Sequence, residues 1–180
     1  MSSADLSRVR QLIRDVPDFP KPGVLFKDIA PLLGSAEEFA EAIDALAAPY
    51  LPANGRAVVD KVVGIEARGF ILAAPVAYRC KAGFVPVRKA GKLPWRVEAQ
   101  ECVLEYGTAM LEVHEDAIVP GERVLIVDDV LATGGTGRAT AMLVERLGGK
   151  VVGVLTSLEI EVLGGRQVLA DYDVSSLLRY

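Results

Sequence analysis

Residues that bind soft metals or build disulfide frameworks are scarce in this chain of 180 residues. It has two cysteines, Cys80 and Cys102, and a single histidine, His114. The cysteines form no CxxC pair, so a Cys/His zinc site is excluded. Free thiols without a disulfide framework are typical of a reducing compartment. We therefore expect a cytoplasmic protein in which both cysteines behave as small apolar residues.

Long apolar runs and an excess of basic charge are also missing. The longest apolar run, Phe70–Tyr78, contains Pro75 and is far shorter than the roughly 20 residues that cross a bilayer. The N-terminal segment carries Arg8, Arg10 and Asp15 where a signal peptide has its apolar region. The net charge is −4 and the pI is near 5.1. We expect no membrane and no nucleic-acid partner, because anionic membranes and nucleic acids both attract basic surfaces.

The residue types that are present are those of a single globular domain. Hydrophobic residues make up 51% of the chain and charged residues 24%. This balance excludes a disordered or low-complexity chain. A chain of this length buries roughly 70% of its unfolded surface, which is enough to fold without a metal or a disulfide. We expect one domain over residues 1–180.

Apolar spacing predicts strands that alternate with helices, which is typical of an α/β fold with a mostly parallel sheet. Residues 89–101 show no clear period and are expected to form a loop. The expected helices cover residues 5–16, the segment after a capping box at 35–38, residues 70–82 and residues 138–147. The expected buried strands are 62–65, 84–87, 124–127 and 151–155, with a hairpin of 103–106 and 109–113 that turns at Gly107-Thr108.

The segment Val124–Gly137 carries the strongest chemical signal. Its strand is apolar on both faces and is expected to end at Asp128 and Asp129, at the sheet edge where open α/β sheets bind ligands. A loop of small residues follows, and its amides and hydroxyls lie just before a helix, where an anion is stabilised. The loop residues are Ala132, Thr133, Gly134, Gly135 and Thr136.

Two carboxylates beside a phosphate loop suit a ribose 5-phosphate. Carboxylates repel phosphate, but they accept hydrogen bonds from a ribose diol. We therefore predict that Asp128 and Asp129 bind the diol and that residues 132–136 bind the 5-phosphate. An ordinary capped turn beside a solvated strand end is the alternative, and the combined pattern favours the site. Walker A and G-x-G-x-x-G patterns are both absent, so nucleoside triphosphate and NAD chemistry are not supported.

Together these residues resemble the type I phosphoribosyltransferases, which use 5-phosphoribosyl 1-pyrophosphate (PRPP). Further segments occur in the order found in the adenine-specific members of that family, and the likeness runs from about residue 5 to the end. Residues 95–100 match no pattern of the family. The matching segments are Phe19–Ile29, Glu66–Phe70, Val85–Lys89 with Gly91–Pro94, and Leu104–Gly107.

The resemblance implies a fold and a reaction. The fold is an open, mostly parallel, twisted sheet flanked by helices, with a small hood over residues 1–34 and a β-hairpin lid over residues 89–113. The reaction is purine salvage, in which adenine displaces pyrophosphate from PRPP to give AMP, with Mg²⁺ as cofactor. Displacement at an anomeric carbon passes through an oxocarbenium-like state, and lid closure would exclude water. The resemblance also implies a homodimer.

The resemblance assigns roles to residues outside the acidic motif. Arg68, in a strand-to-helix turn, is expected to bind pyrophosphate and to take part in catalysis. Arg88, Lys89 and Lys92 are expected to reach the pyrophosphate, partly across a dimer interface, although such a basic cluster alone is usually a solvated face. Glu105 is expected to manage a proton on a purine nitrogen.

Adenine and Mg²⁺ are expected to have their own contacts. Leu25, Phe26 and Lys27 lie in a proline-rich extended segment that resembles the adenine pocket, and Ile160 is expected on its apolar face. Without the resemblance, the apolar residues among them would be assigned to the core. An extended backbone can read a base edge, and an unmatched buried polar group costs about 1–3 kcal/mol. Mg²⁺ is expected to arrive on PRPP, with the acidic pair as its nearest protein contacts.

Three other functions stay open at this point. A phosphoribosyltransferase for hypoxanthine or xanthine would differ in substrate competition. A non-catalytic PRPP-sensing regulator would need a DNA-binding domain or a basic surface, and the pI near 5.1 argues against both. A generic α/β domain that binds sugar phosphates is the third.

Overall fold

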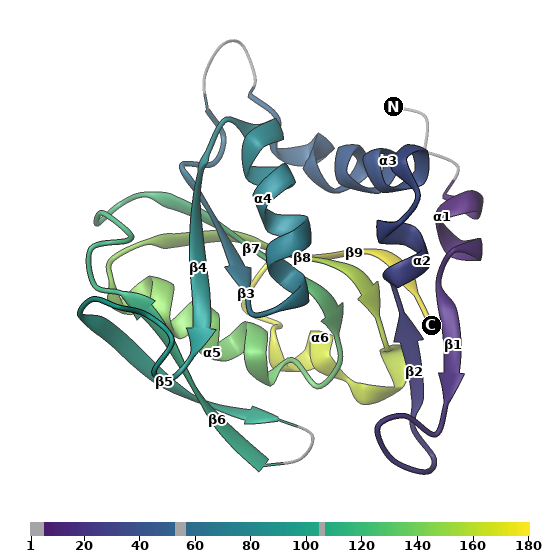
Figure 1. Cartoon of the computed structure of the whole chain (residues 1–180). Coiled ribbons are helices and arrows are strands. Elements are labelled where there is room, and N and C mark those ends of the chain that lie inside the picture. Colours follow the sequence, from purple (N-terminus) through teal and green to yellow (C-terminus); the bar gives the residue numbers. More distant parts are fainter. Residues whose placement is uncertain (1–5, 53–56, 105–106) are drawn as a thin grey trace. The chain divides into compact units, whose positions relative to one another are not determined.

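The structure is a computed structural model that describes residues 6–52, 57–104 and 107–180. Within those ranges the strands form one seven-stranded sheet and one two-stranded sheet (Figure 1). The chain divides into two compact units, the first ending at Ala45 and the second running from Leu46 to Tyr180. The small sheet belongs to the first unit and the large sheet to the second.

The first unit is built on an antiparallel strand pair. The helix expected over residues 5–16 is wrong in length, because α1 ends at Gln11 and a strand begins at Arg14. That strand ends at Pro17. A residue before a proline disfavours helical backbone angles. Residues 14–17 are instead extended and pair with residues 25–28. Its elements are α1 (Ser7–Gln11), β1 (Arg14–Pro17), β2 (Leu25–Asp28), α2 (Ala30–Leu33) and α3 (Ala36–Ala47).

The second unit is the α/β layer structure that the sequence predicts. In the part of the chain that the structure describes, its sheet has the order β5-β6-β4-β3-β7-β8-β9. Strands β4, β3, β7, β8 and β9 are parallel, and β6 is antiparallel to both β4 and β5. Its elements are η1 (Ala48–Tyr50), β3 (Lys61–Ile65), α4 (Arg68–Cys80), β4 (Gly83–Lys89), β5 (Val97–Leu104), β6 (Gly107–His114), β7 (Arg123–Leu131), α5 (Gly135–Arg146), β8 (Lys150–Glu159), η2 (Glu161–Leu163), α6 (Gly165–Val168) and β9 (Val174–Arg179).

Helices cover both faces of the central strands. Gly64 of β3 faces α4, because a Cβ there would come 2.8 Å from the Ala73 side chain. Val63, its neighbour in the strand, belongs to the apolar cluster that contains Leu143 and Val144 of α5. Since successive strand residues point to opposite faces, α4 and α5 lie on opposite sides of the sheet. Burial on both faces explains why residues 62–65 of β3 and 124–127 of β7 are continuous apolar runs.

The edge of the sheet differs most from the sequence prediction. The loop expected over residues 89–101 is wrong in its second half, where β5 begins at Val97. The turn expected at Gly107-Thr108 is also wrong, because Leu104 pairs with Gly107 and both turn residues belong to β6. An edge strand with polar residues shows little apolar alternation. Its polar positions are instead bound by α5, where Arg146 donates to the Glu98 carboxylate at 2.5 Å.

Two simpler expectations can be compared with the structure. Cys80 and Cys102 are both buried and free, as the sequence predicts. Among the described residues, every helix is too short or too polar to span a bilayer.

Candidate active site

The acidic pair lies where β7 extends past its neighbour β3. The expectation that the strand ends at Asp128 is wrong, because β7 continues to Leu131. Pairing between β3 and β7 stops at Gly64 and Val127, whereas β8 continues beside β7 as far as Glu159. Asp128 is therefore the first residue of β7 beyond that pairing. The carboxylates still lie at the carboxyl edge of the sheet, where ligands of such folds bind.

Arg68 meets Asp129 at this edge. Arg68 is the first residue of α4, and its Nε lies 2.5 Å from Oδ2 of Asp129. Asp129 is buried, with 6% of its surface exposed, and its backbone carbonyl accepts a 2.6 Å hydrogen bond from Ser157 Oγ. The structure thus brings together two residues that the sequence assigned to different parts of the substrate. It adds Ser157, which positions Asp129 from β8 and which carried no signal in the sequence.

Close approach between α4 and β7 requires a glycine. A Cβ on Gly69 would lie 2.8 Å from Oδ1 of Asp128 and 3.1 Å from the Val127 carbonyl oxygen. The same Oδ1 atom accepts a 2.9 Å hydrogen bond from the Asp129 amide. Gly69 therefore lets the start of α4 lie directly on the acidic pair.

Both carboxyl groups of the pair are hard to ionise. Burial raises the pKa of Asp128 well above its ordinary value, and the Asp129 charge beside it raises that pKa further. Burial also raises the pKa of Asp129, although the Arg68 charge acts in the opposite direction. Two adjacent carboxylates with these properties favour partners that donate hydrogen bonds or carry positive charge. Ribose hydroxyls and a divalent cation are both of that kind.

The phosphate loop is shaped by contact with α6. Gly134 has a φ of +82° and caps α5, and a Cβ there would come 2.6 Å from the Gly165 carbonyl oxygen. A Cβ on Gly165 would in turn collide with the Ala132 carbonyl oxygen. The helix expected from residue 138 begins earlier, at Gly135, so its first amides belong to the loop and have no acceptor within the helix. Gly165 is a residue that sequence reasoning missed.

A small cavity of about 50 Å³ opens above this loop and beside the acidic pair. Thr136 lies in its lining, and the Cys102 thiol of β5 donates to the Thr136 hydroxyl at 3.7 Å. Free amides, hydroxyls and a helix start are the groups that stabilise a bound anion. The other lining residues include Asp128, Ala132, Thr133, Gly134, Gly137 and Thr156.

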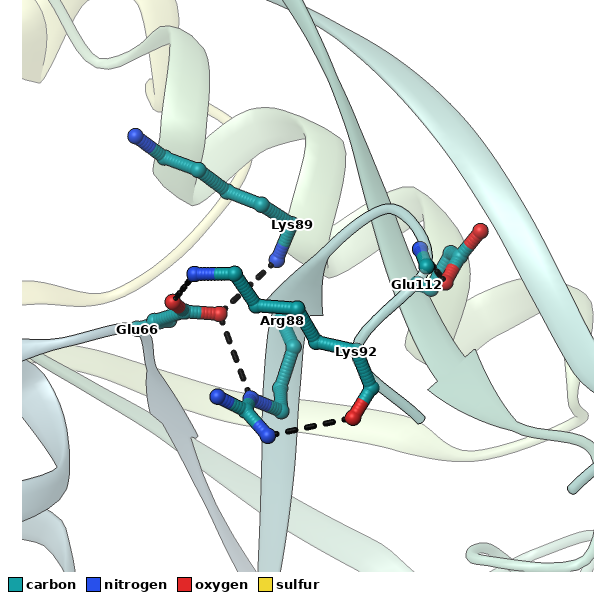
Figure 2. Close-up of polar contacts among 6 residues, drawn as sticks. Glu66, Arg88, Lys89, Lys92 and Glu112 are labelled. Carbon is teal, nitrogen blue, oxygen red and sulfur yellow. Dashed lines mark hydrogen bonds and ion pairs between the residues drawn. The ribbon is translucent and has the colours of Figure 1, made fainter. Parts of the chain in front are cut away.

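The expected pyrophosphate residues at the end of β4 gather around one carboxylate, that of Glu66 (Figure 2). Arg88 Nε lies 3.2 Å and the Lys89 amide 3.1 Å from Glu66 Oε2, and Lys92 Nζ contacts Oε1. Burial raises the pKa of Glu66, but donation by Lys92, Lys89 and Arg88 outweighs it and leaves that pKa lowered. Sequence reasoning passed over Glu66, since an acidic residue runs against the charge expected at an anion site.

The expected adenine residues belong to both units. Ile160 follows β8, and its amide donates to the Leu131 carbonyl oxygen at 2.9 Å, next to the start of the phosphate loop. In the first unit, Leu25, Phe26 and Lys27 all lie in β2. The Lys27 ammonium donates to the Asp15 carboxylate at 2.6 Å, so its charge is neutralised inside that unit.

Two aromatic rings cover β2 in the first unit. Phe26 packs edge-on against Phe19 with ring centroids 5.1 Å apart. Leu25 is exposed beside them. Glu105, the expected proton-managing residue, lies outside the described residues.

A larger cavity of about 460 Å³ lies between β8, α6 and β9. Its charges already bind one another: Arg166 donates to Glu159 at 2.6 Å and to the Val174 carbonyl oxygen at 2.6 Å. Arg179 also lies 3.5 Å from Glu159. The small cavity is the better candidate, because a carboxylate at a strand end and the loop before a helix line it together.

The acidic pair fits a magnesium ion that arrives with a substrate. Across residues 6–52, 57–104 and 107–180, no three carboxylate, histidine or cysteine side chains are grouped to hold a metal. Asp128 and Asp129 offer neighbouring carboxylates with raised pKa values. Mg²⁺ in proteins usually has one or two carboxylate ligands and completes its shell with substrate oxygens and water.

Comparison with known proteins agrees with this geometry. Residues 33–176 match the family model of the phosphoribosyl transferase domain. An adenine phosphoribosyltransferase of Thermobifida fusca is 56% identical over 176 residues, which are 97% of this chain and 98% of that protein. A crystal structure of adenine phosphoribosyltransferase from Rhodothermus marinus has a TM-score of 0.89 and 52% identity, and covers 97% of this chain and 98% of that one.

A third relative was solved with ligands. The adenine phosphoribosyltransferase of Saccharomyces cerevisiae, complexed with an imino-altritol bisphosphate and adenine, has a TM-score of 0.87 and 35% identity. The match covers 95% of this chain and 97% of the yeast chain. The acidic pair, the glycine loop after β7 and the arginine at the start of α4 agree with this likeness in sequence and fold. The chain belongs to the phosphoribosyltransferase family, among its adenine phosphoribosyltransferases.

Proposed function

We propose that this chain transfers the 5-phosphoribosyl group of PRPP to adenine and so produces AMP and pyrophosphate in purine salvage. The observation that carries the proposal is the meeting of three features at the end of β7. These are the acidic pair with its buried Asp129, the glycine loop that caps α5, and Arg68 at 2.5 Å from Asp129. A phosphoribosyltransferase for hypoxanthine or xanthine is not favoured, because the similar proteins are named adenine phosphoribosyltransferases.

The ribose 5-phosphate half of PRPP binds along β7. Asp128 and Asp129 accept hydrogen bonds from the ribose hydroxyls, which relieves the cost of two adjacent buried carboxylates. The 5-phosphate lies against the amides of residues 132–137, at the positive end of α5. Because the ribose and the 5-phosphate bind different groups, the phosphate stays away from the carboxylates.

The pyrophosphate half leaves toward the cations. The bond from C1 to pyrophosphate breaks, a bond from a ring nitrogen of adenine to C1 forms, and adenine loses one proton. Arg68 neutralises the departing charge from the start of α4, and Arg88, Lys89 and Lys92 do so from the end of β4. Mg²⁺, when bound, supplies further charge neutralisation on the pyrophosphate, and the acidic pair would hold it.

Adenine is recognised by backbone groups of β2. In the first unit this strand is extended and pairs with β1, and the N–H and C=O groups of an extended backbone can read a base edge. A backbone acceptor for the 6-amino group would reject a 6-oxo purine at about 1–3 kcal/mol. Leu25 and Phe26 contribute apolar surface from β2. The resemblance to the family assigns an apolar contact with adenine to Ile160 as well.

Glu105 takes up or returns the proton on a purine nitrogen. This role comes from the resemblance of Leu104–Gly107 to the family. General acid–base help of this kind contributes about 10²–10⁴-fold in rate. A Glu105→Gln variant is expected to lose turnover to that extent while keeping its affinity for PRPP, and near-normal turnover would contradict the role.

The enzyme works as a homodimer through α4 and β4. Ile71 and Tyr78 lie about two turns apart on one face of α4, and Tyr78 is 84% exposed. Phe84 of β4 is exposed as well. A second copy of the chain would cover this apolar face and bring part of the basic cluster near the partner's site. Light scattering should give twice the chain mass, and Tyr78→Asp should shift it toward the monomer. A monomeric parent protein would contradict the dimer.

The deciding experiment measures pyrophosphate release from PRPP and Mg²⁺ with adenine, hypoxanthine, xanthine or guanine. Pyrophosphate release with adenine alone supports the proposal. Release with a 6-oxo purine that is as fast as release with adenine contradicts it. Asp129→Asn should weaken PRPP binding more than adenine binding, because its carboxylate is assigned to the ribose. Equal loss for both substrates would contradict that assignment.

A further inference from the structure

We propose that Glu66 is a positioning residue for pyrophosphate binding, which fixes the segment Arg88–Lys92 against the end of β3. This inference rests on the proposed function, because the segment matters to catalysis only if the chain handles PRPP. It concerns a residue that touches the basic groups and is assigned no contact with the reacting atoms.

Three donors from one short segment converge on Glu66. The Arg88 side chain and the Lys89 amide bind Oε2 at 3.2 and 3.1 Å, and the Lys92 ammonium binds Oε1 (Figure 2). Glu66 itself is held by its amide, which donates to the Val87 carbonyl oxygen at 2.9 Å. One carboxylate therefore ties the last residues of β4 and the turn beyond them to the end of β3.

Burial makes this carboxylate unusual for a sheet edge. The Glu66 side chain is only 8% exposed, whereas Lys92 is 45% exposed. A carboxylate buried to that degree is strongly destabilising unless it is paired and hydrogen-bonded. Here it is paired with two cations and a backbone amide, so its ionised form holds the segment in one arrangement. A glutamine side chain has one acceptor oxygen and no charge, so it would hold the two cations less strongly.

The charge count leaves the segment suited to an anion. Arg88, Lys89 and Lys92 carry three positive charges, against one negative charge on Glu66 and one on Glu112 at the Gly91 amide. The Lys89 ammonium points away from Glu66 in Figure 2, while its amide faces the carboxylate. Glu66 thus orders the backbone of the segment and leaves net positive charge for the pyrophosphate.

A second anchor restrains the far side of the same turn. The Gly91 amide donates to Glu112 Oε2 at 2.9 Å, from the strand next to β4 (Figure 2). Gly91 has a φ of +79°, so the turn adopts a conformation that other residues resist. Arg88 also donates to the Lys92 carbonyl oxygen at 3.1 Å. The turn is thereby held at the end of β3 on one side and by β6 on the other. Of the two carboxylates, Glu66 is the one that pairs with the charged groups of Arg88 and Lys92.

The test uses Trp95, the only tryptophan, which is 65% exposed shortly after Lys92. Its fluorescence quenching by acrylamide and its anisotropy report the order of the turn without any substrate. Glu66→Gln should raise the quenching constant about twofold and lower the anisotropy, because a neutral amide loses its charged partners. Glu66→Asp keeps the charge and should restore part of both signals. Glu37→Gln, which removes a carboxylate that is 80% exposed on α3 of the first unit, is the matched control.

Kinetics give the second readout. Glu66→Gln should raise KM for PRPP about tenfold, which matches the loss of a charge-assisted hydrogen bond, and should leave KM for adenine within about twofold. Unchanged Trp95 signals overturn the proposal, as does an equal rise in both KM values, which indicates general damage. A lower KM for PRPP overturns it too, since the carboxylate would then oppose the substrate. Failure of the parent protein to release pyrophosphate would refute the enzymatic function instead, while the Trp95 signals still decide the positioning role.

Discussion

The guanidinium Nε of Arg68 lies 2.5 Å from Oδ2 of Asp129, and this contact ties the start of α4 to the strand that passes beyond β3. It places a cation assigned to pyrophosphate directly beside a carboxylate assigned to ribose. The two halves of PRPP would therefore meet protein groups that already compensate each other's charge.

Removal of Arg68 should expose the cost of the buried Asp129 charge. We expect Arg68→Met to lower the free energy of unfolding by about 1–2 kcal/mol near pH 7.5, since Arg68 is partly solvated. Urea unfolding of Arg68→Met, Asp129→Asn and the double variant measures the coupling. The double variant should recover part of the loss, and strictly additive effects would show that the contact contributes nothing.

Substitution of Gly165 should disturb the 5-phosphate loop, which packs against it. A methyl group there collides with the Ala132 carbonyl oxygen and lies 2.9 Å from the Gly134 amide nitrogen. Gly165→Ala should therefore cost about 1–3 kcal/mol of stability and weaken AMP binding by displacing the 5-phosphate loop. Gly34→Ala is a useful comparison, because neither glycine has a positive φ and a Cβ on Gly34 would have its nearest neighbour at 3.6 Å. Equal AMP affinity in the parent protein and Gly165→Ala would contradict the prediction.

Asp128 should reduce stability at neutral pH. Its pKa is raised by burial and by the Asp129 charge, so the folded chain binds its proton more tightly than the unfolded chain does. The stability linked to this group is present below its unfolded pKa of 3.8 and is lost as pH rises through the higher folded pKa. Asp128→Asn should thus raise Tm near neutral pH, in the presence of a chelator, and lose ribose 5-phosphate binding. The gain should shrink toward pH 4, and a gain independent of pH would contradict the cause.

Asp60 should behave in the opposite way. Hydrogen bonds from the Arg123 side chain, first of all, lower its pKa from 3.8 to about 2. Its contribution is present above the unfolded pKa and is lost as pH falls through the folded pKa. Asp60→Asn should therefore destabilise the chain by about 0.5–1 kcal/mol near neutral pH, because the pair is partly exposed to solvent. Urea unfolding at several pH values should show this difference shrinking below pH 3.8.

The acidic motif was predictable because its chemistry is contiguous in the sequence. Asp128, Asp129 and the loop of residues 132–136 follow one another, and any fold that buries the preceding strand carries them to the same sheet edge. The alternating fold class was predictable for a related reason, since apolar periodicity reflects which faces are buried.

The remaining parts of the site depend on which strands are neighbours. Ser157 reaches Asp129 because β8 lies beside β7, and Glu66 reaches Arg88 because β3 lies beside β4. Hydrogen bonds of this kind join positions far apart in the chain, and no local pattern marks them. The edge strand β5 was missed for a similar reason, because its polar residues are bound by Arg146 of α5.

The sequence by itself therefore determined the α/β class, the ribose phosphate motif and the family, since each depends on residue order along short segments. Only the tertiary structure decided how far β7 extends past β3, which glycines let helices approach it, and which carboxylate holds the basic segment. The physical reason is that strand order and register set these distances, and both result from packing of the whole sheet rather than from any one segment.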